Sequence, residues 1–349
     1  MAMVGFGLLV TILATGVTLG VLEFESRTNN QPGNIRSGVT ITEDSAIVQA
    51  AAKAKPAVVS VVTQSEPSPV SGSGYLATSD GYIVTNISVV ARATTMKVLV
   101  LGDSKPHNAR LVDYDCQTGV AVIKIDQVSG LPTLAFADPA TLVQGQVLVA
   151  VAGPVTGSAV TRGIISALHR PVTVPDPVGS GRNQEISDTI QTDPMLQAGA
   201  NGAPILNVGG QVLGIAMSVS GSAAGAGGFA LSAAGVQDDV QQILQTGQVV
   251  VPSLGATGTD LTQQMAALDG LPEGNRLVTV DADGPAAAAG LKPGDVITQL
   301  DDVNLDAAHP LRLLLRSRFH ANQRVTVTYT RGSNSTQVQL TLAGVHPTC

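Results

Sequence analysis

The feature that most constrains the fold is a succession of short, β-branched apolar runs that turn residues interrupt. Between residues 58 and 219 the runs are VVSVV, YIVTN, KVLVLG, VAVIKI, QVLVAVAG, GIISAL, PILN and QVLGIAMSV. Short strands at such spacing are typical of an all-β barrel or sandwich. Charged residues make up only 13% and aromatic residues 3% of the chain, so the cores must be built from Val, Ile, Leu and Ala. We therefore expect a mostly β protein.

Composition divides the chain into four parts. Residues 1–22 carry no charged side chain, and residues 23–44 are polar and aperiodic, as in a flexible tether. The β-rich pattern occupies residues 45–246 and opens with an Ala-rich segment, 46–55, that predicts a short helix ending before proline. A second folded unit covers residues 253–345 and mixes strands with a helical segment.

The uncharged N-terminus predicts a membrane anchor. Twenty-odd apolar residues at about 1.5 Å each span the roughly 30 Å hydrocarbon core of a bilayer. The alternative is a cleaved signal peptide, but the basic start of such a signal is missing and the apolar run is long. No Lys or Arg precedes Arg27, so the positive-inside rule does not orient the segment.

Charge and cysteine content exclude some functions. The net charge is −7 and Lys and Arg form no cluster, which argues against nucleic acid as a partner. Cys116 and Cys349 allow at most one disulfide, and neither lies in a C-x-x-C or metal-binding pattern. We expect no metal and no cofactor, and the pairing of the two cysteines stays open.

Four stretches of the chain resemble the HtrA family of trypsin-like serine proteases. They are KAKPAVVSVV (53–62), GSGYLATSDGYIVTN (72–86), AVTRGIISAL (159–168) and GGFALSAAGV (227–236), with QTD and PILN between the last two. Their fixed order argues against chance. The resemblance implies a trypsin-like double β-barrel followed by a PDZ domain, an extracytoplasmic location and a role in protein quality control.

All three catalytic positions that the resemblance implies are replaced. The family pattern T-N-x-H-V-V reads TNISVV here, so that Ser88 occupies the His position. The family pattern around the catalytic Asp reads TGVAVIKI here, so that Gly119 occupies the Asp position. The nucleophile motif G-N-S-G-G-P reads GANGAP, so that Asn201 occupies the Ser position. Gly199 is retained and would belong to a relic of the oxyanion turn.

These replacements remove the chemistry of the triad, which needs a hydroxyl nucleophile, an imidazole base and an orienting carboxylate. Loss of the whole triad costs on the order of 10⁶ in turnover in subtilisin. His107 and His169 are the only histidines in this part of the chain; the first lies in a turn-like segment and the second at a strand end. The sequence therefore predicts a pseudoprotease.

The stretch GPAAAAGLKPGDVI (284–297) resembles the core of a PDZ domain. Such domains bind an extended C-terminal peptide by strand addition and hold its carboxylate in backbone N–H groups. A loop before the first strand and the helical segment 310–318 would form the site. For Leu311 and Leu315 the alternative role is packing in the hydrophobic core. The predicted peptide-binding residues are Ser253, Leu254, Gly255, Ala256, Leu311 and Leu315.

Three functions follow from these features. The first is a membrane-anchored, extracytoplasmic scaffold, adaptor or regulator that binds protein C-termini through the PDZ domain. The second is an envelope serine endopeptidase of the HtrA type. The third is a regulatory subunit that joins catalytically intact relatives in a mixed oligomer. Whether the chain forms a homo- or a hetero-oligomer stays open.

Overall fold

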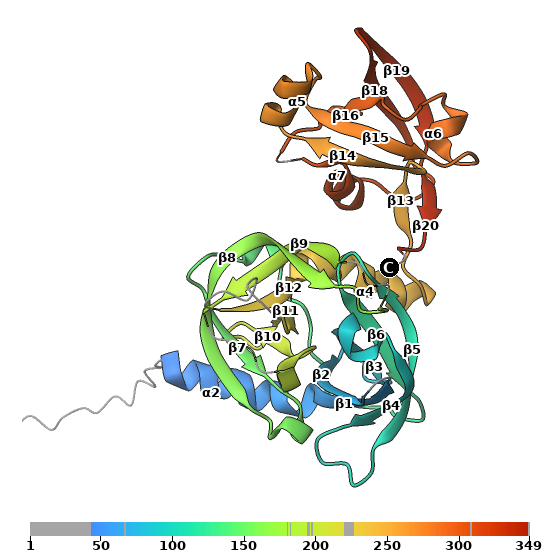
Figure 1. The fold of residues 1–349 in the computed structure, drawn as a ribbon. Coiled ribbons are helices and arrows are strands. Elements are labelled where there is room, and N and C mark those ends of the chain that lie inside the picture. The colour runs from blue at the N-terminus through green and yellow to red at the C-terminus, as the bar shows by residue number, and fades with distance from the viewer. Residues whose placement is uncertain are drawn as a thin grey trace, which may run out of the picture. The chain divides into compact units, whose positions relative to one another are not determined.

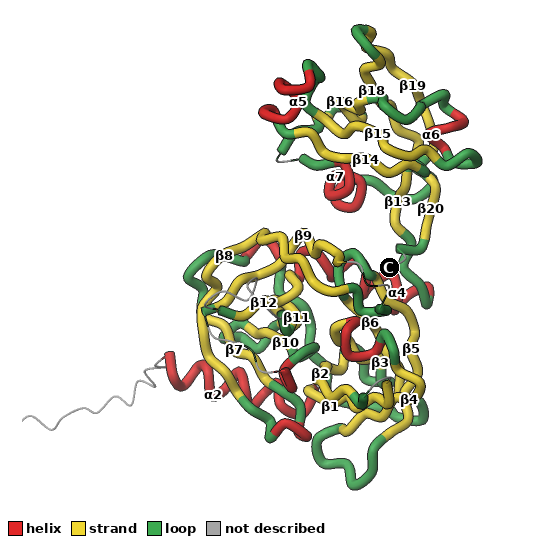
Figure 2. The backbone as a smooth tube through the Cα atoms, viewed as in Figure 1, coloured by secondary structure: helices red, strands yellow, loops and turns green. Residues whose placement is uncertain are grey.

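The fold contains two closed β-barrels and a third, smaller β unit (Figure 1, Figure 2). The predicted anchor, 1–22, and nearly all of the predicted tether, 23–44, lie outside the described residues. Within the part of the chain that is described, no helix is both long and apolar enough to cross a bilayer. The computed structural model describes residues 43–65, 68–179, 181, 183–193, 196, 198–219, 227–307 and 309–347.

The first barrel is formed by β1 (Val58–Ser65), β2 (Val70–Leu76), β3 (Tyr82–Asn86), β4 (Ala93–Leu99), β5 (His107–Asp115) and β6 (Val120–Ile125), with the one-turn helix α3 (Ile87–Val90) after β3. The strand order is β1-β2-β3-β6-β5-β4, and β4 pairs with β1 to close the barrel. All six residues of β6 are buried. Its one charged residue, Lys124, is satisfied because its Nζ donates to the carbonyls of Asp80 and Ile125, both at 2.7 Å.

The second barrel is formed by β7 (Val147–Val151), β8 (Val160–Pro175), β9 (Asn183–Thr192), β10 (Pro204–Leu206), β11 (Val212–Met217) and β12 (Gly228–Ser232). The strand order is β10-β11-β12-β9-β8-β7, and pairing of β7 with β10 closes it. Short 3₁₀ turns connect these elements: η1 (Lys55–Ala57), η2 (Pro139–Thr141), η3 (Pro154–Thr156) and η4 (Ala198–Ala200). Two barrels are what the resemblance to trypsin-like proteases implies.

Two helices flank the barrels. The predicted helix at 46–55 is confirmed as α2 (Glu43–Ala54), which gives way to η1 where Pro56 removes a backbone donor. Helix α4 (Ala233–Thr246) follows β12; the Ser232 side chain caps its first turn, and Gly247 ends it with a φ of 80°.

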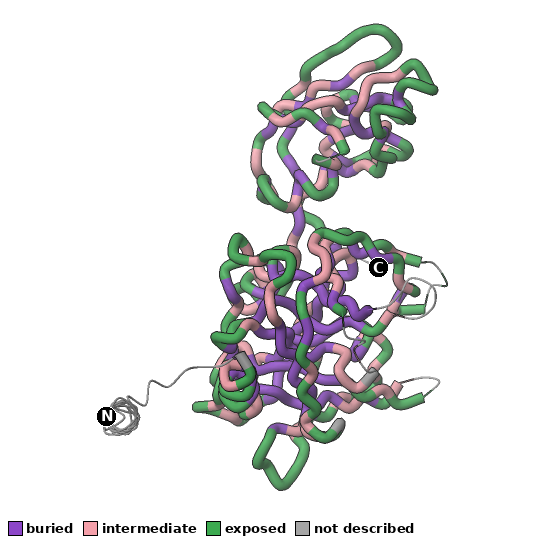
Figure 3. The backbone as a smooth tube through the Cα atoms, turned by 90° about the vertical axis from the view of Figure 1, so that its left-hand side faces the viewer, coloured by how far each residue is buried: buried purple, intermediate pink, exposed green. Residues whose placement is uncertain are grey.

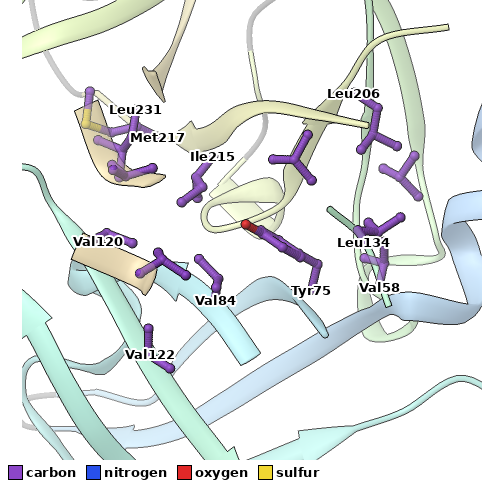
Figure 4. Packing of buried hydrophobic residues seen from close by; sticks show 14 of the residues in the cluster. Val58, Tyr75, Val84, Val120, Val122, Leu134, Leu206, Ile215, Met217 and Leu231 are labelled. Atoms are coloured by element: carbon purple, nitrogen blue, oxygen red, sulfur yellow. The ribbon is translucent and has the colours of Figure 1, made fainter. Parts of the chain in front are cut away.

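Aliphatic side chains from both barrels meet in one core cluster. Figure 4 shows Tyr75 among Val84, Ile215 and other residues of this cluster. The Tyr75 ring is 1% exposed and meets Phe136 edge-on, with ring centroids 6.1 Å apart. Figure 3 shows the buried segments inside the barrels and the exposed ones in the loops. Each fully buried aliphatic side chain contributes about 1.5–3 kcal/mol, so a core with few aromatic residues suffices.

The third unit is formed by β14 (Ala256–Leu261), β15 (Gly274–Val280), β16 (Val296–Leu300), β17 (Val303–Asn304), β18 (Arg324–Arg331) and β19 (Asn334–Thr341), with helices α5 (Gln263–Asp269), α6 (Pro285–Ala288) and α7 (Leu311–Arg318). The sheet order is β14-β15-β16-β18-β19, which makes β14 an edge strand. The unit has its own hydrophobic core. Two short strands, β13 (Val251–Ser253) and β20 (Ala343–Val345), pair with each other at its chain ends.

Cys116 lies in the turn after β5 and is 1% exposed. It is disulfide-bonded in the structure. Cys349 lies outside the described residues.

Candidate functional site

The three positions that the family resemblance assigns to a triad lie together. Ser88 is in α3, Gly119 is in the turn between β5 and β6, and Asn201 lies between η4 and β10 of the second barrel. The Asn201 side-chain nitrogen donates to the Ser88 hydroxyl across the barrels at 2.7 Å. The Ile87 backbone N–H donates to the Gly119 carbonyl at 2.8 Å. These hydrogen bonds bring the three positions together.

A closed set of hydrogen bonds fixes these polar side chains. Ser88 Oγ donates to Asn86 Oδ1 at 2.8 Å while accepting from Asn201, and the Ser88 N–H donates to the same Asn86 oxygen at 2.9 Å. Asn201 Oδ1 accepts from the Ser218 N–H at 3.3 Å. The Ser88 proton is therefore held by an amide oxygen, which is too weakly basic to activate a hydroxyl. Sequence reasoning missed the roles of Asn86 and Ser218, although Asn86 stands in the quoted TNISVV motif.

The backbone at Gly119 has adapted to glycine. Its φ is 80°, in the left-handed region that side chains with a Cβ rarely adopt. A Cβ built there would lie 3.1 Å from Leu231 Cδ2 and 3.5 Å from Ile186 Cδ1. An aspartate at this position would thus be strained by its backbone and would point its Cβ at apolar groups.

A carboxylate does lie nearby, but it serves the turn. Asp115 is fully buried, and its Oδ1 accepts from the backbone N–H groups of Gln117 at 2.7 Å and Thr118 at 3.3 Å. This capping holds the turn on which Gly119 lies. No histidine ring bonds to Asp115 among the hydrogen bonds of the described residues.

The turn that would carry an oxyanion hole is tied to the first barrel. Ser73 on β2 donates its hydroxyl to the Gly199 carbonyl at 2.8 Å and its N–H to the Asn201 carbonyl at 2.8 Å. Gly202 follows with a φ of 85° and packs so closely that a Cβ would lie 2.2 Å from the Ser73 carbonyl oxygen. The turn that carries Asn201 is therefore well fixed.

The two histidines of this region contact aspartates elsewhere. His107 lies at the start of β5 with its Nε2 2.6 Å from Asp103 Oδ2, and His169 lies within β8 with its Nδ1 3.0 Å from Asp188 Oδ1. Neither pairing involves Ser88 or Asn201. Across the part of the chain that the structure describes, no group of three or more His, Cys, Asp or Glu could hold a metal ion.

A cavity of about 320 Å³ opens beside these residues. Asn86, Ser88 and Gly119 line it, together with Met217 and Ser218 of β11 and its following loop. The Asn86 side-chain nitrogen is buried and has no hydrogen-bond partner among the described residues. Hydroxyl and amide groups of these residues line the cavity, together with the charged side chains of Arg92 and Asp176.

The residues predicted to bind a peptide terminus lie in the third unit. Gly255 has a φ of 67°, and its N–H donates to the Ser253 hydroxyl at 3.0 Å. Leu254, Leu311 and Leu315 belong to one hydrophobic cluster and are 2%, 7% and 8% exposed. The structure thus brings these apolar residues together as part of the unit's core, and Ala256 begins the edge strand β14.

Comparison with known proteins decides the family. Residues 72–215 match the trypsin-like peptidase domain and residues 252–342 match the PDZ domain. A serine protease Do-like HtrA of Lactococcus lactis subsp. cremoris is 30% identical over 394 aligned residues, which cover 98% of this chain and 96% of that relative. The chain belongs to the HtrA family of trypsin-like serine proteases.

Other HtrA proteins agree with this assignment. A probable periplasmic serine endoprotease DegP-like of Halomonas elongata is 35% identical over 275 residues, and the alignment covers 73% of this chain but only 56% of that relative. The structure of the HtrA-type protease AlgW with a decapeptide has a TM-score of 0.71 and 27% identity, covering 86% of this chain and 99% of that one. The structure of the serine endoprotease from Yersinia pestis has a TM-score of 0.66 and 28% identity, covering 86% of this chain and 98% of that one. The expected fold of trypsin-like barrels plus PDZ is thereby confirmed.

Proposed function

We propose that this HtrA protein binds the C-termini of other proteins through its PDZ domain and does not cleave them. It would act as a scaffold, adaptor or regulator outside the cytoplasm, anchored by residues 1–22. The extracytoplasmic location is supported by relatives named as periplasmic. The anchor rests on the sequence alone.

One observation carries the non-cleaving part of the proposal: Ser88 and Asn201 are hydrogen-bonded to each other at 2.7 Å in the position of a base and a nucleophile. An amide nitrogen is no nucleophile at neutral pH, and a hydroxyl is no base. The φ of 80° at Gly119 adds that the third position disfavours a carboxylate. The three positions thus support loss of the whole reaction rather than loss of one group.

Peptide binding is supported by the sheet order of the PDZ domain. Strand β14 has β15 as its partner on one side, and its four central residues are exposed. Such an edge offers unpaired N–H and C=O groups to an added strand. The structure of a relative, the HtrA-type protease AlgW, was determined with a decapeptide.

The second candidate is an active HtrA-type serine endopeptidase, and the names of the relatives favour it. It requires a nucleophile and a base other than those at the three positions described. Labelling with a fluorophosphonate probe separates the two candidates, with the Lactococcus relative labelled in parallel as a positive control.

We expect no labelling of the purified chain and no cleavage of casein. Labelling that is lost after heat denaturation, together with casein cleavage, would establish the endopeptidase and refute the proposal. Binding is tested separately with a random library of decapeptides. Peptides with a free C-terminal carboxylate should bind, and their amidated counterparts should not.

A further inference from the structure

Helix α7 lies beside the edge strand β14 and runs in the opposite direction (Figure 1). At the start of the helix, the Leu311 N–H donates to Asp260 Oδ1, near the end of β14, at 3.2 Å. At the other end, Ala321 lies shortly after the helix, and its Cβ is 3.0 Å from a Cβ built on Gly344. Gly344 belongs to β20, which pairs with β13, the strand before β14. The two elements therefore form the sides of one groove, with the start of β14 opposite the end of α7.

This order locates the last side chain of an added peptide. A C-terminal peptide that extends the sheet at β14 would hold its carboxylate at the backbone N–H groups of residues 253–256. Its last side chain then lies at the same end of the groove. Leu315 is one helical turn nearer to that end than Leu311, on the same face of α7. Of the two leucines, Leu315 therefore faces the end of the ligand.

The apolar space at this end of the groove is already filled. Leu254, Leu311 and Leu315 are 2%, 7% and 8% exposed and belong to one hydrophobic cluster, against which Ala256 packs. An open pocket for a large side chain would leave its walls accessible to water, as Leu313 on the same helix is at 42%. A methyl group needs only the edge of this cluster, whereas a Leu or Phe side chain needs a cavity that the leucines occupy.

The wall opposite α7 is held by backbone hydrogen bonds. The Leu254 carbonyl accepts from the Ala286 N–H, and the Gly255 carbonyl accepts from the Asp281 N–H, both at 2.8 Å. Gly255 also packs against Pro285, so that a Cβ on Gly255 would lie 2.9 Å from the proline Cδ. A large ligand side chain would have to force apart a fixed loop and a packed helix. Overfilling a packed apolar site in this way lowers affinity by about tenfold or more.

We infer that the PDZ domain selects proteins whose chains end in Ala or Gly, and that Leu315 excludes larger terminal residues. The inference rests on the proposed function of this domain and adds the class of partner. The carboxylate supplies the binding that all C-termini share, and the filled space behind it supplies the choice between them.

The test measures how affinity depends on the last residue of the peptide. The probes are fluorescein-labelled decapeptides that share the sequence of the tightest binder of the full-length wild type in a random library and end in Gly, Ala, Val, Leu or Phe. Fluorescence anisotropy gives Kd for each. The peptides that end in Ala and Gly should bind the wild type about tenfold or more tightly than those that end in Leu and Phe. Equal or tighter binding of the Leu or Phe peptide would overturn the inference.

One substitution should reverse this order. Leu315→Ala removes the carbon atoms that the ligand gains when its last residue changes from Ala to Leu, so the total volume is conserved. The peptide that ends in Leu should then bind this variant about tenfold or more tightly than the one that ends in Ala. Leu313→Ala is the matched control, because it makes the same change at an exposed position of the same helix, and it should keep the wild-type order. A folded Leu315→Ala that keeps the wild-type order contradicts the role of Leu315.

A second variant covers the case in which Leu315→Ala does not fold, since truncation of a buried leucine is destabilising. Leu315→Val removes less and should reduce the preference for Ala over Val as the last residue by about threefold or more. Hydrogen exchange of β18 shows whether the PDZ domain of each variant is folded. An unchanged preference in folded Leu315→Val would refute the inference alone. If no peptide binds any of these proteins, the PDZ function fails and the inference fails with it.

Discussion

The conformation at Gly119 makes a quantitative prediction about returning a side chain to that position. Gly119→Ala adds only a Cβ, in a backbone with a φ of 80°. The left-handed conformation costs a non-glycine residue about 1–2 kcal/mol. The new Cβ also lies 3.1 Å from Leu231 Cδ2, a side chain that is fully buried. We expect the first barrel to be destabilised by about 2–3 kcal/mol, after the smaller entropy of the unfolded alanine chain is deducted.

A matched glycine separates the two contributions. Gly102 has a similar φ of 93°, and a Cβ built there meets nothing within 4 Å. Gly102→Ala should therefore show the backbone cost alone, about 1 kcal/mol, and the difference between the variants measures the crowding at Leu231.

The assay is native-state hydrogen exchange of β3 and β6, which reports on the first barrel in the full-length chain. Exchange should be faster in Gly119→Ala than in Gly102→Ala. Equal protection in the two variants, or greater protection in Gly119→Ala than in wild type, would refute the reasoning. An aspartate at 119 would then be no harder to accommodate than in a working protease.

Three further predictions concern single side chains. Burial raises the pKa of Asp239 from 3.8 to about 7, so the folded state holds a proton that the unfolded state has lost. The free energy of unfolding should therefore fall as pH rises from about 4 to 7, by at most about 1.4 kcal/mol per pH unit. Urea titrations should show this slope, and Asp239→Asn should remove it. Ser88→Ala should cost about 0.5–1.5 kcal/mol in the same titrations and leave fluorophosphonate labelling at the wild-type level. Gly255→Ala should abolish binding of the library decapeptides, because its Cβ would lie 2.9 Å from Gly284 Cα and the loop at residues 253–256 would have to shift. Gly270→Ala, with a φ of 65° and nothing within 4 Å of the new Cβ, should bind the same peptides normally.

The local part of the candidate site could be predicted from the sequence. Neighbouring residues in the sequence identify three short motifs as turns and strand ends of the fold: TNISVV, TGVAVIKI and GANGAP. The structure brings Ser88, Gly119 and Asn201 of these motifs together. The helix α7 of the PDZ domain, predicted as the segment 310–318, likewise follows from a local pattern in the chain.

Long-range electrostatics could not be predicted in this way. Arg316 and Asp115 are 201 residues apart, and nothing in either neighbourhood marks them as partners. The sequence shows a glycine at 119 but not its φ, which depends on how the turn is capped by Asp115. The apolar residues Leu311 and Leu315 were predicted as a pocket, yet their burial gives them a packing role as well. A peptide-binding role for them remains a proposal.

The pairing of β13 with β20 has a consequence for how such chains are assembled. Val251 lies opposite Val345, so the PDZ domain enters and leaves the fold at neighbouring points. Because the two ends of the domain lie on paired strands, another domain with adjacent termini could replace it without a change in the length of either connecting segment. Exchange of the segment between these two valines is therefore a natural way to give the barrels a new binding specificity.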